Sequence, residues 1–445
     1  MQIRKLALSL SLLCAAGAAL ADITIGVSLS ATGPAASLGI PEKNTVALLP
    51  QTLAGEKVKW VVLDDATDTS TGVKNARKMV SEDKADVLIA ATATPVSMAI
   101  LEVAFETKTP QIALAPVPPA GEKSAWIFST PQSFGLMAEA IVGHMTANGV
   151  KTVGFIGYAD PYGDLWLKAM QGAAEPKGIK IVASERYQRA DTSVTGQALK
   201  LLAANPDAVL VAGSGTPAVL PQSTLIERGY KGKFYQTHGI ANRDFLRVGG
   251  KNVEGTIFPV GPMLLAEQLP DSHPSKKPAL DYVKLYEGAH GPNSRSTFGA
   301  HAYDAFLLLG RAVPEAMKKA RPGTPEFRAA LRDALENVKE LPAAHGVFSM
   351  SPTNHNGFDA RAAIMATVSN GDWKLLKLAK RRSPACASRR RRWTSSGAPM
   401  ACRCCARRSP CGPTRAASAN TSSAGRARRP TAASLPSVPA PSGAD

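Results

Sequence analysis

Two loops of similar composition carry the side chains best suited to bind an anion. One is Val87-Leu-Ile-Ala-Ala-Thr-Ala-Thr-Pro95, and the other is Val209-Leu-Val-Ala-Gly-Ser-Gly-Thr-Pro217. In each loop a threonine (Thr94, Thr216) stands where a helix N-cap belongs, and proline follows at the first helical position, where its missing N–H costs nothing. A helix N-terminus with accessible N–H groups and a hydroxyl suits a carboxylate or a phosphate. Either loop alone also fits an ordinary capped helix, so the binding interpretation rests on the recurrence of the pattern.

Two further loops offer aromatic and imidazole groups at predicted strand ends. The segment Gly157-Tyr-Ala-Asp-Pro-Tyr-Gly-Asp164 supplies Tyr158 and Tyr162, and Thr237-His-Gly239 supplies His238. A tyrosine at a strand end can form one wall of a ligand site, although tyrosine in α/β proteins also packs in the core. A single histidine is more often structural than functional, so its spacing alone assigns His238 no role.

The sequence lacks the motifs that carry common catalytic chemistry. It has no G-x-S-x-G, no G-x-x-x-x-G-K-[ST], no H-E-x-x-H and no G-x-G-x-x-G after a predicted strand. The seven histidines include no pair at the helical i, i+4 spacing, and residues 22–380 contain no cysteine. The acids Asp64, Asp65 and Asp68 suit a turn and a helix start better than an acid–base pair. We therefore expect a protein that is not an enzyme and binds no metal or cofactor.

These loops connect segments whose patterns alternate between strand and helix. The predicted strands are 23–30, 59–63, 86–90, 111–115, 126–129, 151–158, 180–184, 208–212 and 233–237, with a final hairpin of 364–368 and 373–376 turned by Asn370-Gly371. The predicted helices include 71–81, 96–107, 162–176, 194–204, 217–228, 279–289, 298–320 and 325–338. Two rounds of alternation predict an α/β fold of two Rossmann-like lobes with parallel central sheets. Ligands of such sheets bind at the carboxyl ends of the strands.

The charge of the chain is concentrated at its end. The 445 residues have a formal net charge of +17, but the segment from Lys380 onward holds 14 basic residues and one acid. The part between the first 21 residues and this segment is close to neutral. A basic chain often binds nucleic acid. Here the distribution argues against a nucleic-acid partner for the main body.

The N-terminus has the pattern of a secretory signal peptide. Arg4 and Lys5 precede an apolar run from Leu6 to Leu20, and Ala19-Leu-Ala21 forms a small-x-small cleavage site. We expect residues 1–21 to be removed after Ala21 and the mature chain to reach the periplasm; an uncleaved membrane anchor is the alternative. No later segment approaches 18 consecutive apolar residues, so we expect a mature chain that is not embedded in the membrane.

Residues 379–445 differ from the rest in composition. In 381–445, Ala, Arg, Ser and Pro account for 46 of 65 residues, and Ile, Phe and Tyr are absent. Such a segment cannot bury enough apolar surface to offset its ordering entropy, so we expect a disordered basic tail. One interpretation is an arm for nucleic acid or an anionic surface, centred on 389–392. The other is a frameshift product, in which a GC-rich gene is read in the wrong frame.

The main body resembles the periplasmic substrate-binding proteins of ABC importers, of type I fold, in the branch related to the leucine/isoleucine/valine-binding protein. The resemblance covers roughly 22–377 and is carried by the segments 25–34, 64–68, 110–116, 157–163 and 229–232. It implies two lobes, 22–130 with 260–345 and 131–259 with 346–378. Three crossings near Thr130, Pro259 and Gly346 would form a hinge that closes on a small ligand. It also implies delivery to a membrane permease and its ATPase subunits. The sequence gives no sign of oligomerisation, so we expect a monomer.

Departures from the family pattern point to a different ligand class. His238 stands where the amino-acid binders of the family have an acid that pairs with the ligand ammonium, and an unpaired buried ammonium is costly. Leu38 replaces a tryptophan wall, small residues replace a tyrosine at Gly215-Thr216, and Thr67 occupies a position of the family's disulfide. We expect a small organic acid, aromatic or α-keto, rather than a branched-chain amino acid. The alternatives are a branched-chain amino-acid binder and a ligand-sensing module for a membrane receptor.

The resemblance and the loops together give a predicted binding site. Thr92 and Thr94 with their backbone would hold the ligand carboxylate, His238 would bind a second oxygen, and Tyr162 would cover the apolar part. The remaining predicted ligand-binding residues are Leu38, Ala115, Ser214 and Thr216.

Overall fold

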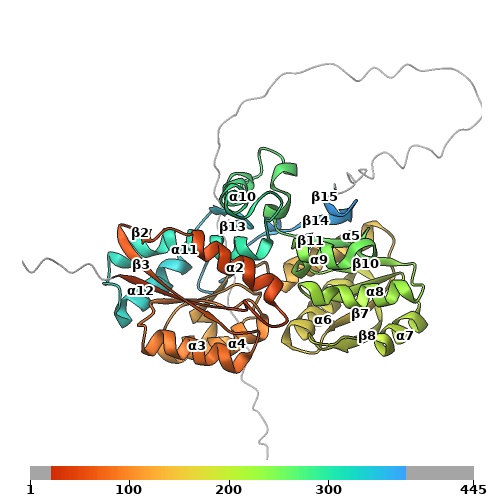
Figure 1. Cartoon of the computed structure of the whole chain (residues 1–445), viewed down its shortest axis with the longest axis horizontal. Helices are drawn as coiled ribbons and strands as arrows, with labels where there is room; N and C mark the ends of the chain where they lie inside the picture. Colours follow the sequence, from red (N-terminus) through yellow and green to blue (C-terminus); the bar gives the residue numbers. More distant parts are fainter. Residues whose placement is uncertain (1–21, 377–445) are drawn as a thin grey trace, which may run out of the picture. The chain divides into compact units, whose positions relative to one another are not determined.

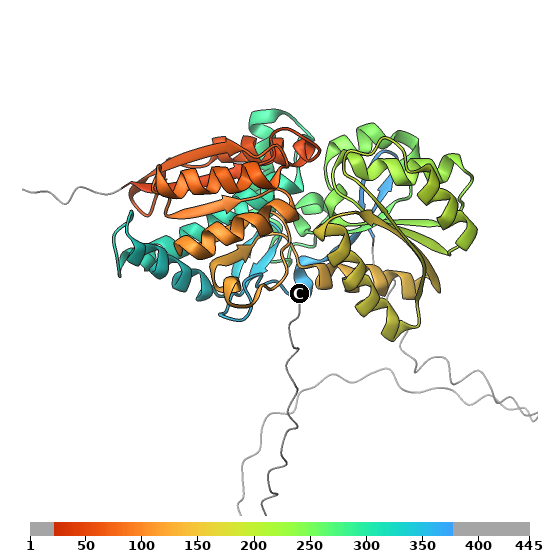
Figure 2. The same ribbon diagram turned by 90° about the horizontal axis from the view of Figure 1, so that it is seen from below.

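A computed structural model describes residues 22–376 of the chain (Figure 1). The predicted signal peptide (1–21) and the basic tail (379–445) lie outside the described residues. Within 22–376, no helix combines the length and apolar character needed to cross a bilayer. The described part forms two α/β lobes that lie side by side (Figure 2). The predicted fold class is therefore confirmed.

The first lobe is built on a six-stranded sheet of order β2-β3-β1-β4-β5-β6, parallel except for the short edge strand β2. Its strands are β1 (Ile23–Leu29), β2 (Thr52–Leu53), β3 (Glu56–Asp64), β4 (Val87–Ala90), β5 (Gln111–Ala113) and β6 (Ile127–Ser129). Every residue of β1 is buried, as expected for a central parallel strand covered on both faces. One face packs against α3 (Thr69–Ser81) and α4 (Thr94–Thr107), and the other against α2 (Ala36–Leu48), α11 (Thr297–Met317) and α12 (Pro325–Glu336).

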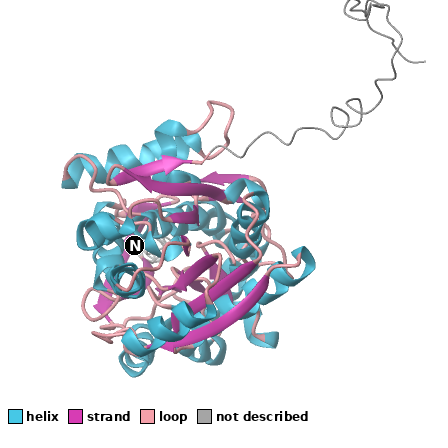
Figure 3. Cartoon of the chain, turned by 90° about the vertical axis from the view of Figure 1, so that its right-hand side faces the viewer, coloured by secondary structure: helices cyan, strands magenta, loops and turns pink. Residues whose placement is uncertain are grey.

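The second lobe is built on a seven-stranded sheet of order β15-β14-β11-β10-β9-β7-β8. Its strands are β7 (Thr152–Tyr158), β8 (Lys180–Tyr187), β9 (Ala208–Ala212), β10 (Lys233–Gln236), β11 (Ile257–Val260), β14 (Ile364–Ser369) and β15 (Asp372–Leu375). Its helices are α5 (Phe134–Ala147), α6 (Pro161–Ala174), α7 (Thr195–Ala204), α8 (Val219–Glu227) and α9 (Arg243–Gly249). Figure 3, with this lobe toward the viewer, shows helices on both sides of the strands.

The hairpin of β14 and β15 confirms a turn predicted from two residues. Asn370 and Gly371 both have positive φ, 55° and 69°, which a two-residue turn of this type requires.

Two helices, α5 and α9, were not predicted. The segment of α5 reads Phe-Gly-Leu-Met-Ala-Glu-Ala-Ile-Val-Gly-His-Met-Thr-Ala, and the Ser133 side chain caps it by accepting the N–H of Leu136.

The third crossing between the lobes lies later than the predicted position near Gly346. A hairpin of β12 (Leu341–Ala343) and β13 (Gly346–Phe348) keeps the chain in the first lobe. Phe348 and Met350 belong to the core of that lobe, and Ser129 N–H donates to the His355 carbonyl at 3.1 Å. The chain therefore passes to the second lobe only between Phe358 and β14. The hairpin of β12 and β13 has no strong sequence signal, so the third crossing was predicted too early in the chain.

The three crossings meet at the side chain of Gln132. Its Nε2 donates to the carbonyl oxygen of His345 at 3.1 Å, in the turn between β12 and β13, and to that of Ala362 at 3.0 Å, on the third crossing. Gly261, just after β11, approaches so closely that a Cβ there would lie 2.5 Å from Gln132 Nε2 and 2.5 Å from His345 Cδ2. One buried amide thus links all three segments of the hinge.

We expect Gln132→Met to destabilise the protein by about 2 kcal/mol, because two buried carbonyls lose their donor while the side chain keeps its length. Denaturant titration measures the free energy of unfolding. Gln171→Met, on the exposed face of α6, is the matched control and should stay within about 0.5 kcal/mol of the wild type. Equal stability of the two variants would show that Gln132 does not hold the hinge.

Candidate ligand-binding site

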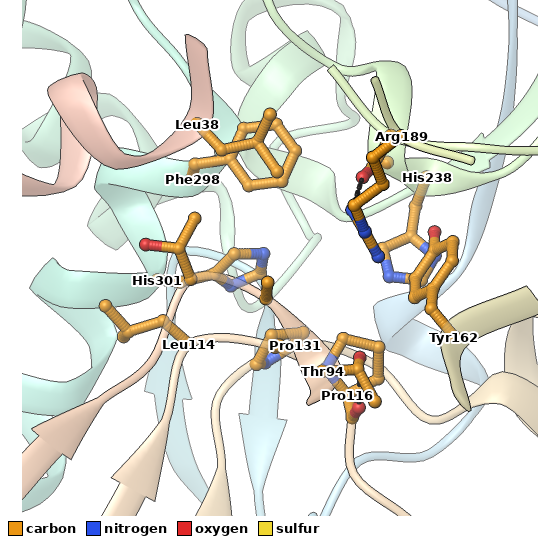
Figure 4. Close-up of a pocket in the computed structure, with 15 residues that line it drawn as sticks. Leu38, Thr94, Leu114, Pro116, Pro131, Tyr162, Arg189, His238, Phe298 and His301 are labelled. Atoms are coloured by element: carbon orange, nitrogen blue, oxygen red, sulfur yellow. Dashed lines mark hydrogen bonds between the residues drawn. The ribbon is translucent and has the colours of Figure 1, made fainter. Parts of the chain in front are cut away.

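A cavity lies between the lobes, where the carboxyl ends of strands from both sheets converge. It contains ≈ 350 Å³ of space between the protein atoms, open solvent at its mouth included. Figure 4 shows Arg189, His238 and Tyr162 along one side and Leu38, Phe298 and His301 along the other. Its lining is Leu38, Thr92, Ala93, Thr94, Leu114, Ala115, Pro116, Pro131, Tyr162, Arg189, Ser214, His238, Gly239, Phe298 and His301.

The cavity brings together all the predicted binding residues except Thr216. Leu38 comes from α2, Ala115 follows β5, and Ser214 follows β9. Thr216 lies outside the lining and is half-buried at the lobe interface, where its N–H donates to Ser37 Oγ at 3.4 Å. The prediction for Thr216 placed it at the cavity because its loop resembles that of Thr94.

The predicted N-cap roles of Thr94 and Thr216 are wrong by one position. Helix α4 begins at Thr94 itself, and its N-cap is Ala93, without a side-chain cap. The Thr94 hydroxyl instead donates to the Pro116 carbonyl at 2.8 Å and ties two lining loops together. Thr216 opens a 3₁₀ turn whose N-cap is Gly215. Proline is therefore the second residue of each helical segment, and neither threonine hydroxyl caps the start of its segment.

The two loops also differ in their free N–H groups. In the first lobe, the N–H groups of Thr92 and Thr94 donate to no acceptor among the described residues. In the second lobe, Ser214 N–H donates to Tyr158 Oη at 3.1 Å, and Gly215 N–H donates to the Gly239 carbonyl at 2.8 Å. Only the first loop therefore presents open donors at the N-terminus of a helix, α4, whose dipole favours an anion.

Arg189 is a lining residue that sequence reasoning missed. Its Nε donates to Asp160 Oδ2 at 2.7 Å, and its Nη1 donates to Ser214 Oγ at 3.3 Å. The guanidinium carbon lies 4.0 Å from the ring centroid of Tyr158, in a cation–π contact. Burial works against its charge, but Tyr158 and Asp160 outweigh burial and raise the pKa of Arg189. Arg189 is the one charged side chain among the described residues that line the cavity.

The reason for missing Arg189 is the length of the preceding strand. The sequence predicted a strand over 180–184, whereas β8 runs from Lys180 to Tyr187. Arg189 therefore lies directly after the carboxyl end of a strand, where ligand contacts are expected. A strand predicted three residues longer would have identified it.

Tyr162 presents its ring rather than its hydroxyl to the cavity side. The hydroxyl is 2.9 Å from Thr237 Oγ1, and the ring packs edge-on against Phe134 and Trp166. Burial raises the pKa of Tyr162 above its usual value, so the phenol stays protonated. Asp160 fixes this residue by capping α6, because its Oδ1 accepts the Tyr162 N–H at 2.9 Å. An apolar ligand surface could pack on this ring.

Two buried imidazoles line the cavity and stay uncharged. Burial and the nearby His345 lower the pKa of His238 to about 3, so its ring is neutral at physiological pH. The same two causes lower the pKa of His301 well below its usual value. Nδ1 of each ring lacks a hydrogen-bond partner among the described residues. His238 can thus contribute a hydrogen bond to a ligand but no charge.

His301 was missed because its position in the site depends on tertiary packing. It lies on α11, far in sequence from every predicted loop, and stacks on His345 with ring centroids 3.9 Å apart. His345 in turn is held by Asp304, with Nδ1 and Oδ2 2.9 Å apart. No spacing in the sequence signals this arrangement.

Comparisons with known proteins agree with this architecture. A family model described as "Periplasmic binding protein" matches residues 22–372. The Leu/Ile/Val-binding protein homolog 3 of Brucella melitensis is 26% identical over 349 residues, which cover 76% of this chain and 89% of that protein.

Solved structures of similar proteins share this two-lobed fold. An extracellular ligand-binding receptor from Rhodopseudomonas palustris is 49% identical with a TM-score of 0.79, and the match covers 80% of this chain and 99% of that one. A solute-binding protein of an ABC transporter from R. palustris, solved with benzoate, is 19% identical with a TM-score of 0.66, covering 80% and 96%; this likeness shows the fold alone. The chain therefore belongs to the periplasmic binding protein family, among the relatives of the Leu/Ile/Val-binding proteins.

Proposed function

We propose that the protein captures a small organic acid, an aromatic or α-keto carboxylate, between its lobes in the periplasm and delivers it to the permease and ATPase subunits of an ABC importer. The lobes close on the ligand, and the protein acts as a binding component rather than an enzyme. The observation that carries the proposal is the charge of the cavity. Arg189 and the open N–H groups of Thr92 and Thr94 face a lining that includes neither Asp nor Glu among the described residues.

This charge pattern disfavours a free amino acid. A carboxylate at the cavity finds a guanidinium and a helix N-terminus, both of which favour an anion. An ammonium group finds no carboxylate, because the nearby Asp160 is already paired with Arg189 at 2.7 Å. A buried charge without a partner is costly, by several kcal/mol.

A branched-chain amino acid is the second candidate. Similar proteins carry the name Leu/Ile/Val-binding protein, and the partnerless Nδ1 atoms of His238 and His301 could accept hydrogen bonds from an ammonium. Neutral imidazoles would supply hydrogen bonds to the ammonium but no negative charge. A branched-chain amino acid should therefore bind more weakly than the organic acid.

A thermal-shift screen of the purified protein tests the proposal. The ligands are aromatic acids, α-keto acids, dicarboxylates and branched-chain amino acids. A ligand at 100 times its dissociation constant stabilises the folded state by about 2.7 kcal/mol, which raises the melting temperature measurably. We expect a shift with aromatic or α-keto acids. A shift with leucine, isoleucine or valine alone would contradict the proposed ligand class and favour the second candidate.

We expect Arg189→Gln to weaken binding of the acid found in the screen by about tenfold to a hundredfold, because a hydrogen bond to a charged group contributes about 1.5–3 kcal/mol. Calorimetric titration measures the dissociation constant. Arg186→Gln removes the same charge from the end of β8, three residues before Arg189 but outside the cavity, since Arg186 Nη2 pairs with Asp164 at 2.9 Å. An equal loss of affinity in the two variants would mean that binding depends on the net charge of the protein and not on Arg189 at the cavity.

The uncharged state of His238 predicts how its replacement changes the pH profile. With a pKa of about 3, His238 is neutral from pH 5 to pH 8, and lowering the pH within this range does not charge it. His238→Gln should therefore weaken acid binding by about tenfold at every pH through the lost hydrogen bond. The ratio of affinities at pH 5 and pH 8 should stay as in the wild type. A changed ratio would show that His238 titrates in this range.

A further inference from the structure

A buried carboxyl group lies directly behind the open loop of the first lobe. Glu42 on α2 is fully buried, and its Oε2 is hydrogen-bonded to the hydroxyl of Thr92, a lining residue of the cavity. Glu42 Oε1 has no partner among residues 22–376. Helix α2 packs directly on the Ser30 backbone here, because Gly39 lies so close that an added Cβ would be 2.0 Å from the Ser30 carbonyl oxygen.

The surroundings of Glu42 keep it uncharged. Burial raises its pKa well above the usual range; the Thr92 hydroxyl opposes this, and the nearby Asp65 adds to it. Tyr282 of α10 (Lys276–His290) faces the same region with a pKa raised by burial, so it stays neutral. The adjacent helix α11 carries His301, which is neutral, and Asp304, which is bound to His345. None of these groups supplies a positive charge to balance an ionised Glu42.

The role of the Thr92 hydroxyl depends on which hydrogen bonds its oxygen accepts. The Ser30 N–H donates to Thr92 Oγ1 at 2.9 Å. The Ser30 hydroxyl does not compete for Thr92, because it donates to Asp65 at 2.6 Å. The Thr92 hydroxyl also lies within hydrogen-bond distance of Glu42 Oε2. An ionised Glu42 accepts the Thr92 hydrogen in this contact, whereas a proton on Oε2 would donate to the Thr92 oxygen and fill its second lone pair. The Thr92 hydroxyl hydrogen is then free to donate elsewhere.

We propose that protonated Glu42 is a positioning residue that makes the Thr92 hydroxyl a donor for the ligand carboxylate. This inference rests on the proposed function, since it concerns recognition of an anion by the loop after β4. Ionised Glu42 would instead take the Thr92 hydrogen as an acceptor and would place a negative charge behind the loop. Both changes weaken anion binding, so affinity falls as the pH rises through the pKa of Glu42. Binding of the anion in turn favours the protonated form.

Four variants of the full chain test this role, with benzoate as the first probe and L-leucine as the second, because both carry a carboxylate. Thr92→Val removes the hydroxyl at nearly constant shape and should weaken binding tenfold or more, whereas Thr92→Ser should stay within threefold of the wild type. Glu42→Gln keeps an uncharged donor toward Thr92 and should stay within threefold at pH 6. Between pH 6 and pH 9, Glu42→Gln should retain whatever affinity the wild type loses. Glu42→Asp shortens the side chain and should lose affinity, as positioning requires.

The proton itself is measured without a ligand. The infrared difference spectrum of wild type minus Glu42→Gln at pH 7 should contain the C=O stretching band of a protonated carboxylic acid. Absence of this band would overturn the proposal, as would a loss in Glu42→Gln at pH 6 equal to that in Thr92→Val. In both cases the binding protein would still bind its acid, so the proposed function would stand. If neither benzoate nor leucine binds, carboxylate recognition at this loop is wrong, and the role of Glu42 fails with it.

Discussion

The ion pair between Asp160 and Arg189 determines the arrangement of the second-lobe half of the site. One carboxylate oxygen caps α6 by accepting the N–H groups of Tyr162 and Gly163, and the other accepts Arg189 Nε at 2.7 Å. Both side chains are largely buried, with Asp160 18% and Arg189 13% exposed. Removing one partner of such a pair leaves an uncompensated buried charge, which costs about 3–5 kcal/mol. The aromatic wall and the cation therefore depend on the same carboxylate.

The two lobes contribute different chemistry to the cavity although their folds are similar. The loop after β4 leaves its N–H groups open, and the register that pairs Ser28 with Ala90 brings Ser30 beside Thr92. The corresponding loop after β9 uses its N–H groups internally and supports Arg189 instead. One lobe thus offers a helix N-terminus and the other a guanidinium. Between them lie neutral imidazoles and apolar walls, an arrangement that favours an anion with an apolar part.

Sequence reasoning found the fold and most of the cavity because strand ends can be located from apolar runs. The loops after β4, β7, β9 and β10 were placed by this rule, and residues from each line the cavity. The errors occurred where one residue of register or a distant contact decides the outcome. The N-cap positions of Thr94 and Thr216 were shifted by one, and β8 was predicted too short to reveal Arg189. His301 and Glu42 enter the site through packing of α11 and α2, which no local pattern encodes.

Among the described residues, the cavity lining offers a guanidinium and a helix N-terminus to a carboxylate and no counter-charge to an ammonium. Calorimetric titration with 4-methyl-2-oxopentanoate and with L-leucine tests it most directly, because the two ligands share a carbon skeleton and a carboxylate and differ at the α-carbon alone. We expect the keto acid to bind at least tenfold more tightly than leucine. Tighter binding of leucine would contradict it and would mean that the imidazoles of His238 and His301 serve an ammonium group.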